Sequence, residues 1–267
     1  MIVIRELMAA IRGEGYSGPA VGARVFQDLV LKAIASGPYS ENITVKGGVL
    51  MRELSHSARR ATMDIDMDFM HFPLTNEGIS RFVDSLNVLE GVSFKIVGEI
   101  VELKQQDYKG KRVFVTVTDG EGSSISSKID LGVHKDLSIS QIPVCFDVCC
   151  NEEGATLLAN SPEQVFTEKL KSLLRFGPTS TRYKDVFDLY YLSKRIDSNL
   201  FAVYLDKLIF TDRSMKERNS HDIVLRVRST FENPMYQRLI ATAGKAKWID
   251  ASVEEAMTGI LSCLEGL

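Results

Sequence analysis

The chain has 267 residues, of which 45% are hydrophobic and 25% are charged, and its formal net charge is −3. This composition is ordinary for a soluble globular protein, and the length suits one large domain or two modest ones. The slight negative charge argues against a protein that coats nucleic acid non-specifically. No apolar run approaches the roughly 18 residues that a membrane span needs. The N-terminus also lacks the basic start, apolar run and cleavage site of a secretory signal. We therefore expect a cytoplasmic protein with no membrane partner.

The N-terminal half alternates between helical and strand patterns. A helical pattern covers residues 4–37 with a glycine-rich break at 13–22, and a second helix is expected over 75–89 with Asn76 as its cap. A hairpin turn is expected at 108–111. Strands are expected at residues 43–50, 63–69, 93–103, 112–118, 126–133 and 144–148.

After about residue 151 the pattern becomes helical. Ser161 is an expected N-cap, Pro162 takes the first helical position, Gln164 completes a capping box, and Gly177 with Pro178 ends the helix. The sequence predicts an α+β fold, with a small mixed sheet and helices in residues 1–150 and a mainly helical lobe in 151–267. Further helices are expected at residues 183–194, 200–209, 234–243 and 252–264.

The four cysteines fit a reducing compartment. They are Cys145, Cys149, Cys150 and Cys263, and no second ligand pair stands at a spacing typical of zinc sites. We expect them to be buried free thiols, in keeping with the preference of cysteine for protein interiors.

The most informative feature is the pair Gly47-Gly48, followed by Asp64-Ile65-Asp66. A glycine pair after a short apolar run lets backbone amides approach phosphate oxygens closely. Asp64 and Asp66, two apart on an alternating strand, leave the same face of the sheet and suit Mg²⁺, which takes oxygen ligands and is completed by phosphates and water. The alternative is a glycine turn beside a solvated strand edge.

Other candidate residues are weaker when each is taken alone. Asp130, on a neighbouring strand, could bind metal or accept a proton from an attacking hydroxyl, or simply pair with Lys128. Lys169 borders the apolar stripe of its helix, so its ammonium could reach triphosphate oxygens or merely snorkel. Asp185 and Asp188 stand at a helix start, where the helix dipole favours carboxylates in any case.

Basic residues exceed acidic ones between residues 167 and 228, with 13 Lys and Arg against 8 Asp and Glu. Such an excess can form a patch for phosphates or RNA, although a solvated helical surface is the commoner explanation.

Four segments, in order, resemble a known family. The stretches 45–51 and 58–66 look like the first motif of the DNA polymerase β-like nucleotidyltransferases. Together with 161–170 and 182–189 they resemble the AbiEii-type nucleotidyl transferase toxins of bacterial toxin–antitoxin systems. The resemblance covers roughly residues 20–195, and it implies a nucleotidyltransferase-like fold for the N-terminal lobe, with the helical lobe completing the active-site cleft.

The resemblance assigns roles to matching positions. It implies that Asp64 and Asp66 bind two Mg²⁺ ions that bridge to an NTP, with Asp130 as the third carboxylate by strand position. Lys169 matches a lysine expected at the nucleotide phosphates, and Asp185 matches the aspartate of the fourth motif. Asp188 is a weaker match, and its role could be no more than to brace its helix. Gly47 and Gly48 would hold the nucleotide, and Arg59 or Arg60 would offset charge on the pyrophosphate.

The family pattern also indicates substrates and partners. Some members modify the 3′ end of tRNA, so tRNA is the expected acceptor, contacted by basic residues of the 167–228 segment, and a separately encoded antitoxin is the expected partner. Where the family usually has Ser or Thr after the glycine pair, this chain has Val49. That departure favours a second hypothesis, a nucleotide- or partner-binding module impaired in catalysis. A third hypothesis keeps the chemistry and transfers the nucleotide to a protein hydroxyl or a small molecule.

Overall fold

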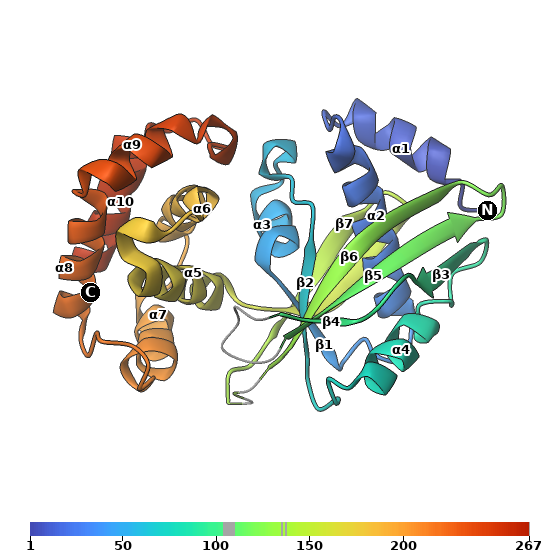
Figure 1. Ribbon diagram of the computed structural model, residues 1–267, viewed down its shortest axis with the longest axis horizontal. Helices are drawn as coiled ribbons and strands as arrows, with labels where there is room; N and C mark the ends of the chain where they lie inside the picture. Colours follow the sequence, from blue (N-terminus) through green and yellow to red (C-terminus); the bar gives the residue numbers. More distant parts are fainter. Residues whose placement is uncertain (104–109, 135, 137, 267) are drawn as a thin grey trace. The chain divides into compact units, whose positions relative to one another are not determined.

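The computed structural model describes residues 1–103, 110–134, 136 and 138–266. The chain divides into two compact units, Met1–Asn160 and Ser161–Leu267. A mixed sheet with helices builds the first unit, whereas every regular element in the described part of the second unit is helical (Figure 1). The predicted α+β fold is therefore confirmed.

The sheet of the first unit has the strand order β3-β5-β6-β2-β1-β8-β7, and β4 also pairs with β5. At its centre β2 runs antiparallel to β1 and parallel to β6, and β1 runs parallel to β8. The remaining strand pairs are antiparallel. The strands are β1 (Ile43–Lys46), β2 (Ile65–Phe69), β3 (Val92–Ile96), β4 (Val101–Leu103), β5 (Gly110–Asp119), β6 (Ser124–Val133), β7 (Ile142–Val148) and β8 (Asn151–Ala159).

In the described part of the first unit, four α-helices pack around this sheet. Helix α2 lies against β6, β7 and β8, α1 packs on α2, α3 contacts β1 and β2, and α4 contacts β3 (Figure 1). On β2 the side chains of Ile65, Met67 and Phe69 are buried on the apolar side, so the side chains between them leave the opposite face. These helices are α1 (Ile4–Gly13), α2 (Pro19–Ser36), α3 (Gly47–Ser55) and α4 (Asn76–Ser85), and a short 3₁₀ turn, η1 (Ala58–Arg60), follows α3.

The strand predicted over residues 43–50 is wrong in its second half. It ends at Lys46, and helix α3 begins at Gly47. Val49, Leu50 and Met51 are all fully buried, and a short apolar run of this kind has the same pattern in a buried helix as in a buried strand. The glycine pair is therefore the first turn of a helix.

Three smaller differences concern element ends. The expected strand 63–69 begins at Ile65, and the cap of α4 is Thr75, whose hydroxyl accepts a hydrogen bond from the Gly78 N–H, instead of Asn76. The expected strand 93–103 is broken by Gly98, which has a φ of 76°, and β3 and β4 then pair with different parts of β5. The expected hairpin turn at 108–111 lies partly outside the described residues, and its last two residues begin β5.

The sequence-based assignment missed β8 altogether. Beyond the predicted boundary at residue 150, this strand pairs with β7 and β1, and the first unit extends to Asn160. Gly154, with a φ of 73°, lies against Cys145 and the Phe146 carbonyl, where an added Cβ would come within 2.8 Å of both. A polar start and an internal glycine hide the strand pattern.

Helix α5 organises the second unit. Ser161 caps it by accepting a hydrogen bond from the Gln164 N–H, Pro162 is its first residue, and Gly177 ends it with a φ of 50°. Phe166 on α5 meets Phe201 on α7 edge to face, and α6 packs against α5 and α10. The α-helices are α5 (Pro162–Phe176), α6 (Tyr183–Ser193), α7 (Ser198–Leu205), α8 (Ser220–Phe231), α9 (Pro234–Thr242) and α10 (Val253–Glu265), with helical turns η2 (Gly177–Thr179), η3 (Asp206–Phe210) and η4 (Gly244–Ala246).

The Ser161 cap and the helix stop are confirmed, whereas the Gln164 side chain, expected to complete a capping box, donates a hydrogen bond to Glu168; the sequence did not predict α8. Its buried residues Ile223, Val227 and Phe231 follow a four-residue spacing, whereas the exposed Leu225 between them adds a strand-like alternation. The cysteines are free, as expected, yet the expectation of burial is wrong: Cys145 is exposed on β7, and Cys149, Cys150 and Cys263 are partly exposed.

Candidate active site

A row of charged residues crosses the centre of the sheet. Lys46 on β1 is in register with Asp66 on β2, Asp66 with Asp130 on β6, and Asp130 with Arg112 on β5. Residues in register leave the same face of a sheet, so four strands present two cations with two carboxylates between them. The prediction that Asp130 lies on a strand beside Asp66 is correct.

The glycine pair lies directly against this row. Gly47 has a φ of 66°, and a Cβ at this position would overlap the Asp66 carboxylate. At Gly48 a Cβ would come within 2.5 Å of the Thr62 hydroxyl. The two glycines therefore let the first turn of α3 approach the Asp66 and Thr62 side chains. The N–H groups of a first helical turn have no partner within the helix and favour anions.

The carboxylates near the start of β2 have cationic neighbours. Asp64 precedes β2, and its carboxylate lies 3.1 Å from the Lys128 ammonium, in a pair that is about one-third exposed. Asp68, two residues beyond Asp66, is buried and accepts a 2.6 Å hydrogen bond from Lys46. Asp68 continues the alternation of Asp64 and Asp66, which is the signal by which sequence reasoning could have found it.

Asp130 is fixed by Arg112. The Nε and Nη2 atoms of Arg112 each donate a 2.7 Å hydrogen bond to one carboxylate oxygen of Asp130. This bidentate pair raises the pKa of Arg112, and the charges of Asp64 and Asp66 raise it further. The pair with Lys128 that was considered for Asp130 is made by Asp64 instead.

The carboxylates near the start of β2 suit a metal ion that takes only some of its ligands from the protein. Within the described ranges, no group of three or more His, Cys, Asp and Glu side chains is arranged to hold a metal ion. Asp66 nevertheless lies against the first turn of α3, and the charges of Asp64 and Asp66 both act on Arg112. Such a pair fits Mg²⁺, because Mg²⁺ takes one or two protein carboxylates and completes its shell with water and substrate phosphates.

The two arginines before β2 differ in exposure. Arg59 is exposed, whereas Arg60, at the end of η1, is buried. Sequence reasoning treated them as equivalent, because a short 3₁₀ turn carries no pattern that separates an inner from an outer position.

A second cluster of charges lies in the helical unit. The Lys169 ammonium on α5 is 2.6 Å from an Asp185 oxygen and 2.8 Å from an Asp188 oxygen, both on α6. Asp188 is completely buried and also accepts a 2.9 Å hydrogen bond from the Trp248 indole. The expectation that Asp188 braces its helix agrees with these contacts, which join α5, α6 and the Trp248 segment. The sequence offered no signal for Trp248.

The fold and these charged clusters define a nucleotidyltransferase-like protein, with carboxylates in the sheet next to a glycine-rich helix start. A comparison with protein-family models matches residues 29–252 to the nucleotidyl transferase AbiEii toxin family of type IV toxin–antitoxin systems. The chain therefore belongs to the AbiEii family of nucleotidyl transferase toxins. The match reaches some 60 residues past the end of the predicted resemblance at residue 195, and it includes α8, α9 and Trp248.

A search of curated proteins finds no significant match to the chain. No described helix combines the length and the apolar character that crossing a bilayer requires.

Proposed function

We propose that the protein is a Mg²⁺-dependent enzyme that transfers a nucleoside monophosphate from an NTP to the 3′ end of tRNA. The observation that carries the proposal is the contact between the glycine pair and the Asp66 carboxylate. It brings a helix N-terminus suited to phosphate and a carboxylate suited to metal to one place. Family membership supports nucleotidyl transfer as the reaction class.

The metal ligands proposed are Asp64 and Asp66. A bound Mg²⁺ would stabilise the attacking and leaving oxygens of an in-line displacement, and two ions are expected. The first-turn N–H groups of α3, at Gly47 and Gly48, would bind phosphate oxygens, and the exposed Arg59 is better placed than the buried Arg60 to offset charge on the pyrophosphate.

Asp130 is proposed to orient or deprotonate the acceptor hydroxyl. Arg112 holds it by a bidentate pair, and a carboxylate in such a pair keeps lone pairs that can accept a further proton donor. Its position in register with Asp66 supports the assignment.

Lys169 is proposed to bind the nucleotide phosphates, with Asp185 holding its ammonium. Asp185 and Asp188 fix the Lys169 side chain, of which 12% is exposed, so that its charge is held in one position. A fixed ammonium loses little conformational entropy when it meets a phosphate.

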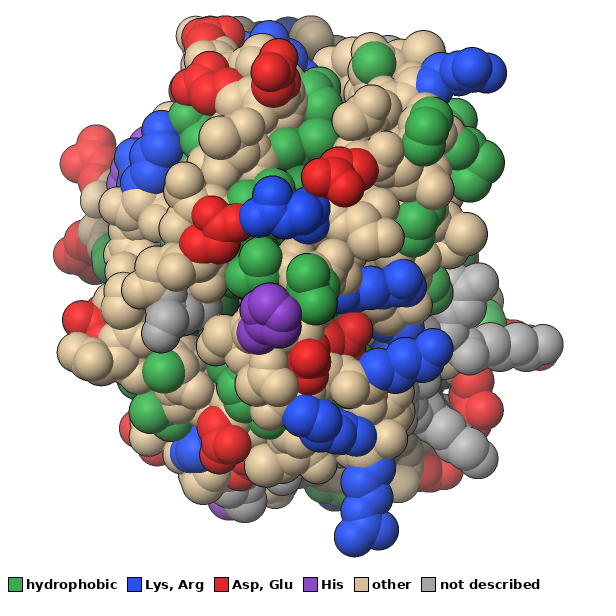
Figure 2. Space-filling view, turned by 90° about the vertical axis from the view of Figure 1, so that its left-hand side faces the viewer, with side chains coloured by type: hydrophobic (Ala, Val, Ile, Leu, Met, Phe, Trp, Pro, Cys, Tyr) green, Lys and Arg blue, Asp and Glu red, His purple; other side chains and the backbone are tan. Residues whose placement is uncertain are grey.

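The proposal that tRNA is the acceptor depends on the basic segment between residues 167 and 228. Part of its charge is neutralised internally, since Lys171 pairs with Asp212. Arg175 and Arg182 are exposed, so they are the better candidates for phosphate contacts. Figure 2 shows basic, acidic and hydrophobic side chains interspersed on a face of the second unit, which favours individual phosphate contacts over a uniform basic patch.

The test is incubation of the purified protein with Mg²⁺, total tRNA and each α-³²P-labelled NTP in turn. We expect one or more nucleotides to label RNA at its 3′ end, and Asp64→Ala to abolish the label. Absence of labelled RNA with all four nucleotides contradicts the tRNA proposal. Label on a Tyr, Ser or Thr of a protein would instead identify a protein acceptor.

The toxin role has its own test, growth after induced expression in a bacterial host. We propose that the enzyme acts in the cytoplasm and is restrained by a separately encoded antitoxin. The wild type is expected to arrest growth and Asp64→Ala is not. Equal toxicity of the two would exclude a catalytic toxin.

A second candidate function, binding without catalysis, is favoured by Val49. This side chain is fully buried in α3 and has no hydroxyl to offer a triphosphate. Nucleotide binding by the wild type without any transfer product would support this candidate.

A further inference from the structure

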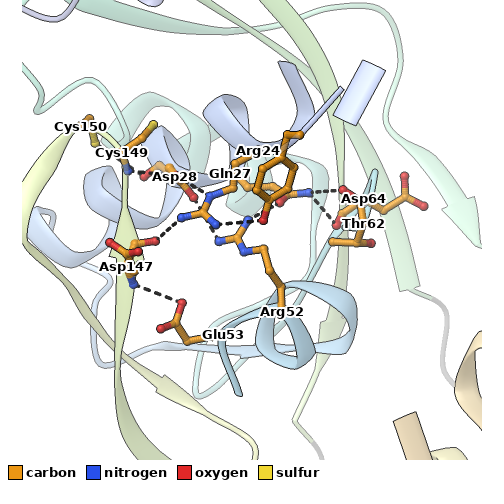
Figure 3. A network of polar contacts seen from close by, with 11 residues as sticks. Arg24, Gln27, Asp28, Arg52, Glu53, Thr62, Asp64, Asp147, Cys149 and Cys150 are labelled. Atoms are coloured by element: carbon orange, nitrogen blue, oxygen red, sulfur yellow. Dashed lines mark hydrogen bonds and ion pairs between the residues drawn. The ribbon is translucent and has the colours of Figure 1, made fainter. Parts of the chain in front are cut away.

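A set of buried polar side chains joins helices α2 and α3 to the segment that carries Asp64 (Figure 3). Gln27 and Asp28 on α2 and Arg52 on α3 are each at most 2% exposed. Buried polar groups are costly unless they are paired, and hydrogen bonds join Gln27 and Asp28 to Arg52, whose Nε alone has no partner among the described residues. Gln27, Asp28 and Arg52 have no part in the reaction proposed above, and Gln27 and Asp28 precede the range matched by the family model.

Gln27 connects Arg52 on α3 to the segment that carries Asp64. Its amide nitrogen donates to the Thr62 carbonyl at 3.0 Å and to the Asp64 carbonyl at 3.3 Å, and its amide oxygen accepts from Arg52 at 2.8 Å. A guanidinium can only donate and a carbonyl can only accept, so the amide has one possible orientation. Figure 3 shows Gln27 between Arg52 on one side and Thr62 with Asp64 on the other.

The segment that Gln27 holds lacks strand pairing. The first registered pair of β2 is Ile65 with Ile129, so residues 61–64 precede the sheet ladder. Carbonyls in such a segment need partners from elsewhere. Gln27 supplies a donor to two of them, one being the carbonyl of Asp64 itself.

Asp28 anchors this set of buried side chains to helix α2. Its carboxylate accepts hydrogen bonds from Arg24 at 2.7 Å, Arg52 at 3.1 Å and the Cys149 N–H at 3.0 Å. Burial disfavours the Arg24 charge, but the attraction of Asp28 outweighs this and raises the pKa of Arg24. Asp28 thereby holds Arg52, and Arg52 holds the amide of Gln27.

We propose that Gln27, oriented by Arg52, is a positioning residue that sets the Asp64 carboxylate relative to the first turn of α3. Arg52 lies on the helix that begins at Gly47, so a single hydrogen-bonded unit fixes both the glycine motif and the aspartate. The inference rests on the proposed function, because it assigns to Gln27 the geometry of the metal and nucleotide site. Groups that orient metal ligands typically change metal affinity by about 10–100-fold when removed.

The test is Mn²⁺ binding by the full chain, measured from the EPR signal of free Mn²⁺, alone and with the α,β-imido analogue of each NTP. Gln27→Glu keeps the acceptor for Arg52 and loses both donations, while Gln27→Met has a similar shape without polar atoms. Gln237→Glu is the control, since the Gln237 amide also donates to a backbone carbonyl, that of Phe231, in the second unit. Asp64→Ala reports on the site itself, and circular dichroism reports on folding.

We expect Asp64→Ala to abolish binding, both Gln27 variants to bind Mn²⁺ about tenfold more weakly while folded, and Gln237→Glu to match the wild type. Wild-type affinity in folded Gln27→Glu and Gln27→Met, with Asp64→Ala impaired, overturns the positioning role alone. Unfolding of both Gln27 variants also overturns it, because Gln27 would then serve folding only. Failure of the wild type to bind, or equal binding by Asp64→Ala, overturns the proposed function instead.

Discussion

The Asp66 carboxylate occupies the space into which any side chain at position 47 would have to grow. Gly47 is therefore required twice, once for its φ of 66° and once for the approach of Asp66. A glycine pair of this kind is usually explained by the ligand that it admits. Here the contact with Asp66 is itself a part of the proposed site.

Gly47→Ala is expected to impair both stability and metal binding. A non-glycine residue in the left-handed region costs about 1–2 kcal/mol, and displacement of Asp66 adds to this. The control is Gly122→Ala, because Gly122 has a φ of 84° and nothing within 4 Å of an added Cβ. Chemical denaturation and Mn²⁺ titration should show a smaller stability loss and unchanged affinity for the control. Equal behaviour of the two variants would show that the Asp66 contact has no consequence.

Asp188 and Asp185 both pair with Lys169, but Asp188 should matter more for stability and Asp185 more for nucleotidyl transfer. Asp188 is fully buried, and its removal takes a carboxylate away from Lys169 and the acceptor away from the Trp248 indole. We expect Asp188→Ala to destabilise the protein by about 3–5 kcal/mol, the range for breaking a buried ion pair.

Asp185→Ala, at the more exposed partner, should lower the free energy of unfolding less and reduce nucleotidyl transfer more. Urea denaturation and the RNA-labelling assay measure the two quantities on the same preparations. A reversed order, with Asp185 the more important for stability, would contradict the division of roles.

Much of this architecture was predictable, and the failures have identifiable causes. The α5 cap at Ser161 and the strand positions of Asp66 and Asp130 follow from local patterns that the fold keeps, whereas Asp64, expected on the same strand as Asp66, precedes β2. The partners of these residues are not local, since Arg112 meets Asp130 across a hairpin and Trp248 meets Asp188 across 60 residues. Gln27 gave no signal, because a buried glutamine in a helix has the same sequence pattern as a solvated one.

Glu53 should make stability depend on pH in a defined direction. Burial raises the pKa of this carboxyl, although the hydrogen bond from the Asp147 N–H and the charge of Arg52 oppose the shift. The folded state therefore binds the proton more tightly than the unfolded state, so stability falls as the pH rises from about 4.3, the ordinary value for Glu, through the native pKa.

Glu53→Gln keeps an acceptor for Asp147 and removes this titration. Its free energy of unfolding, relative to that of the wild type, should rise with pH across that window and then level off. Denaturant melts at half-unit pH steps measure the difference, with Glu152→Gln, at an exposed position on β8, as the control for net charge. A pH-independent difference would mean that burial does not shift the Glu53 pKa.

The bidentate geometry of the pair between Arg112 and Asp130 should matter for catalysis more than the positive charge of Arg112 does. Lysine keeps the charge but lacks the planar fork, so Arg112→Lys leaves Asp130 paired yet free to rotate. We expect kcat for RNA labelling to fall about tenfold with little change in the KM for NTP, because Asp130 is proposed to act on the acceptor. Arg5→Lys is the matched control, since Arg5 makes a 2.7 Å pair with Glu121 at an exposed site. Two results would remove Asp130 from the proposed mechanism: an equal fall in kcat in Arg112→Lys and Arg5→Lys, or an effect of Arg112→Lys on the KM alone.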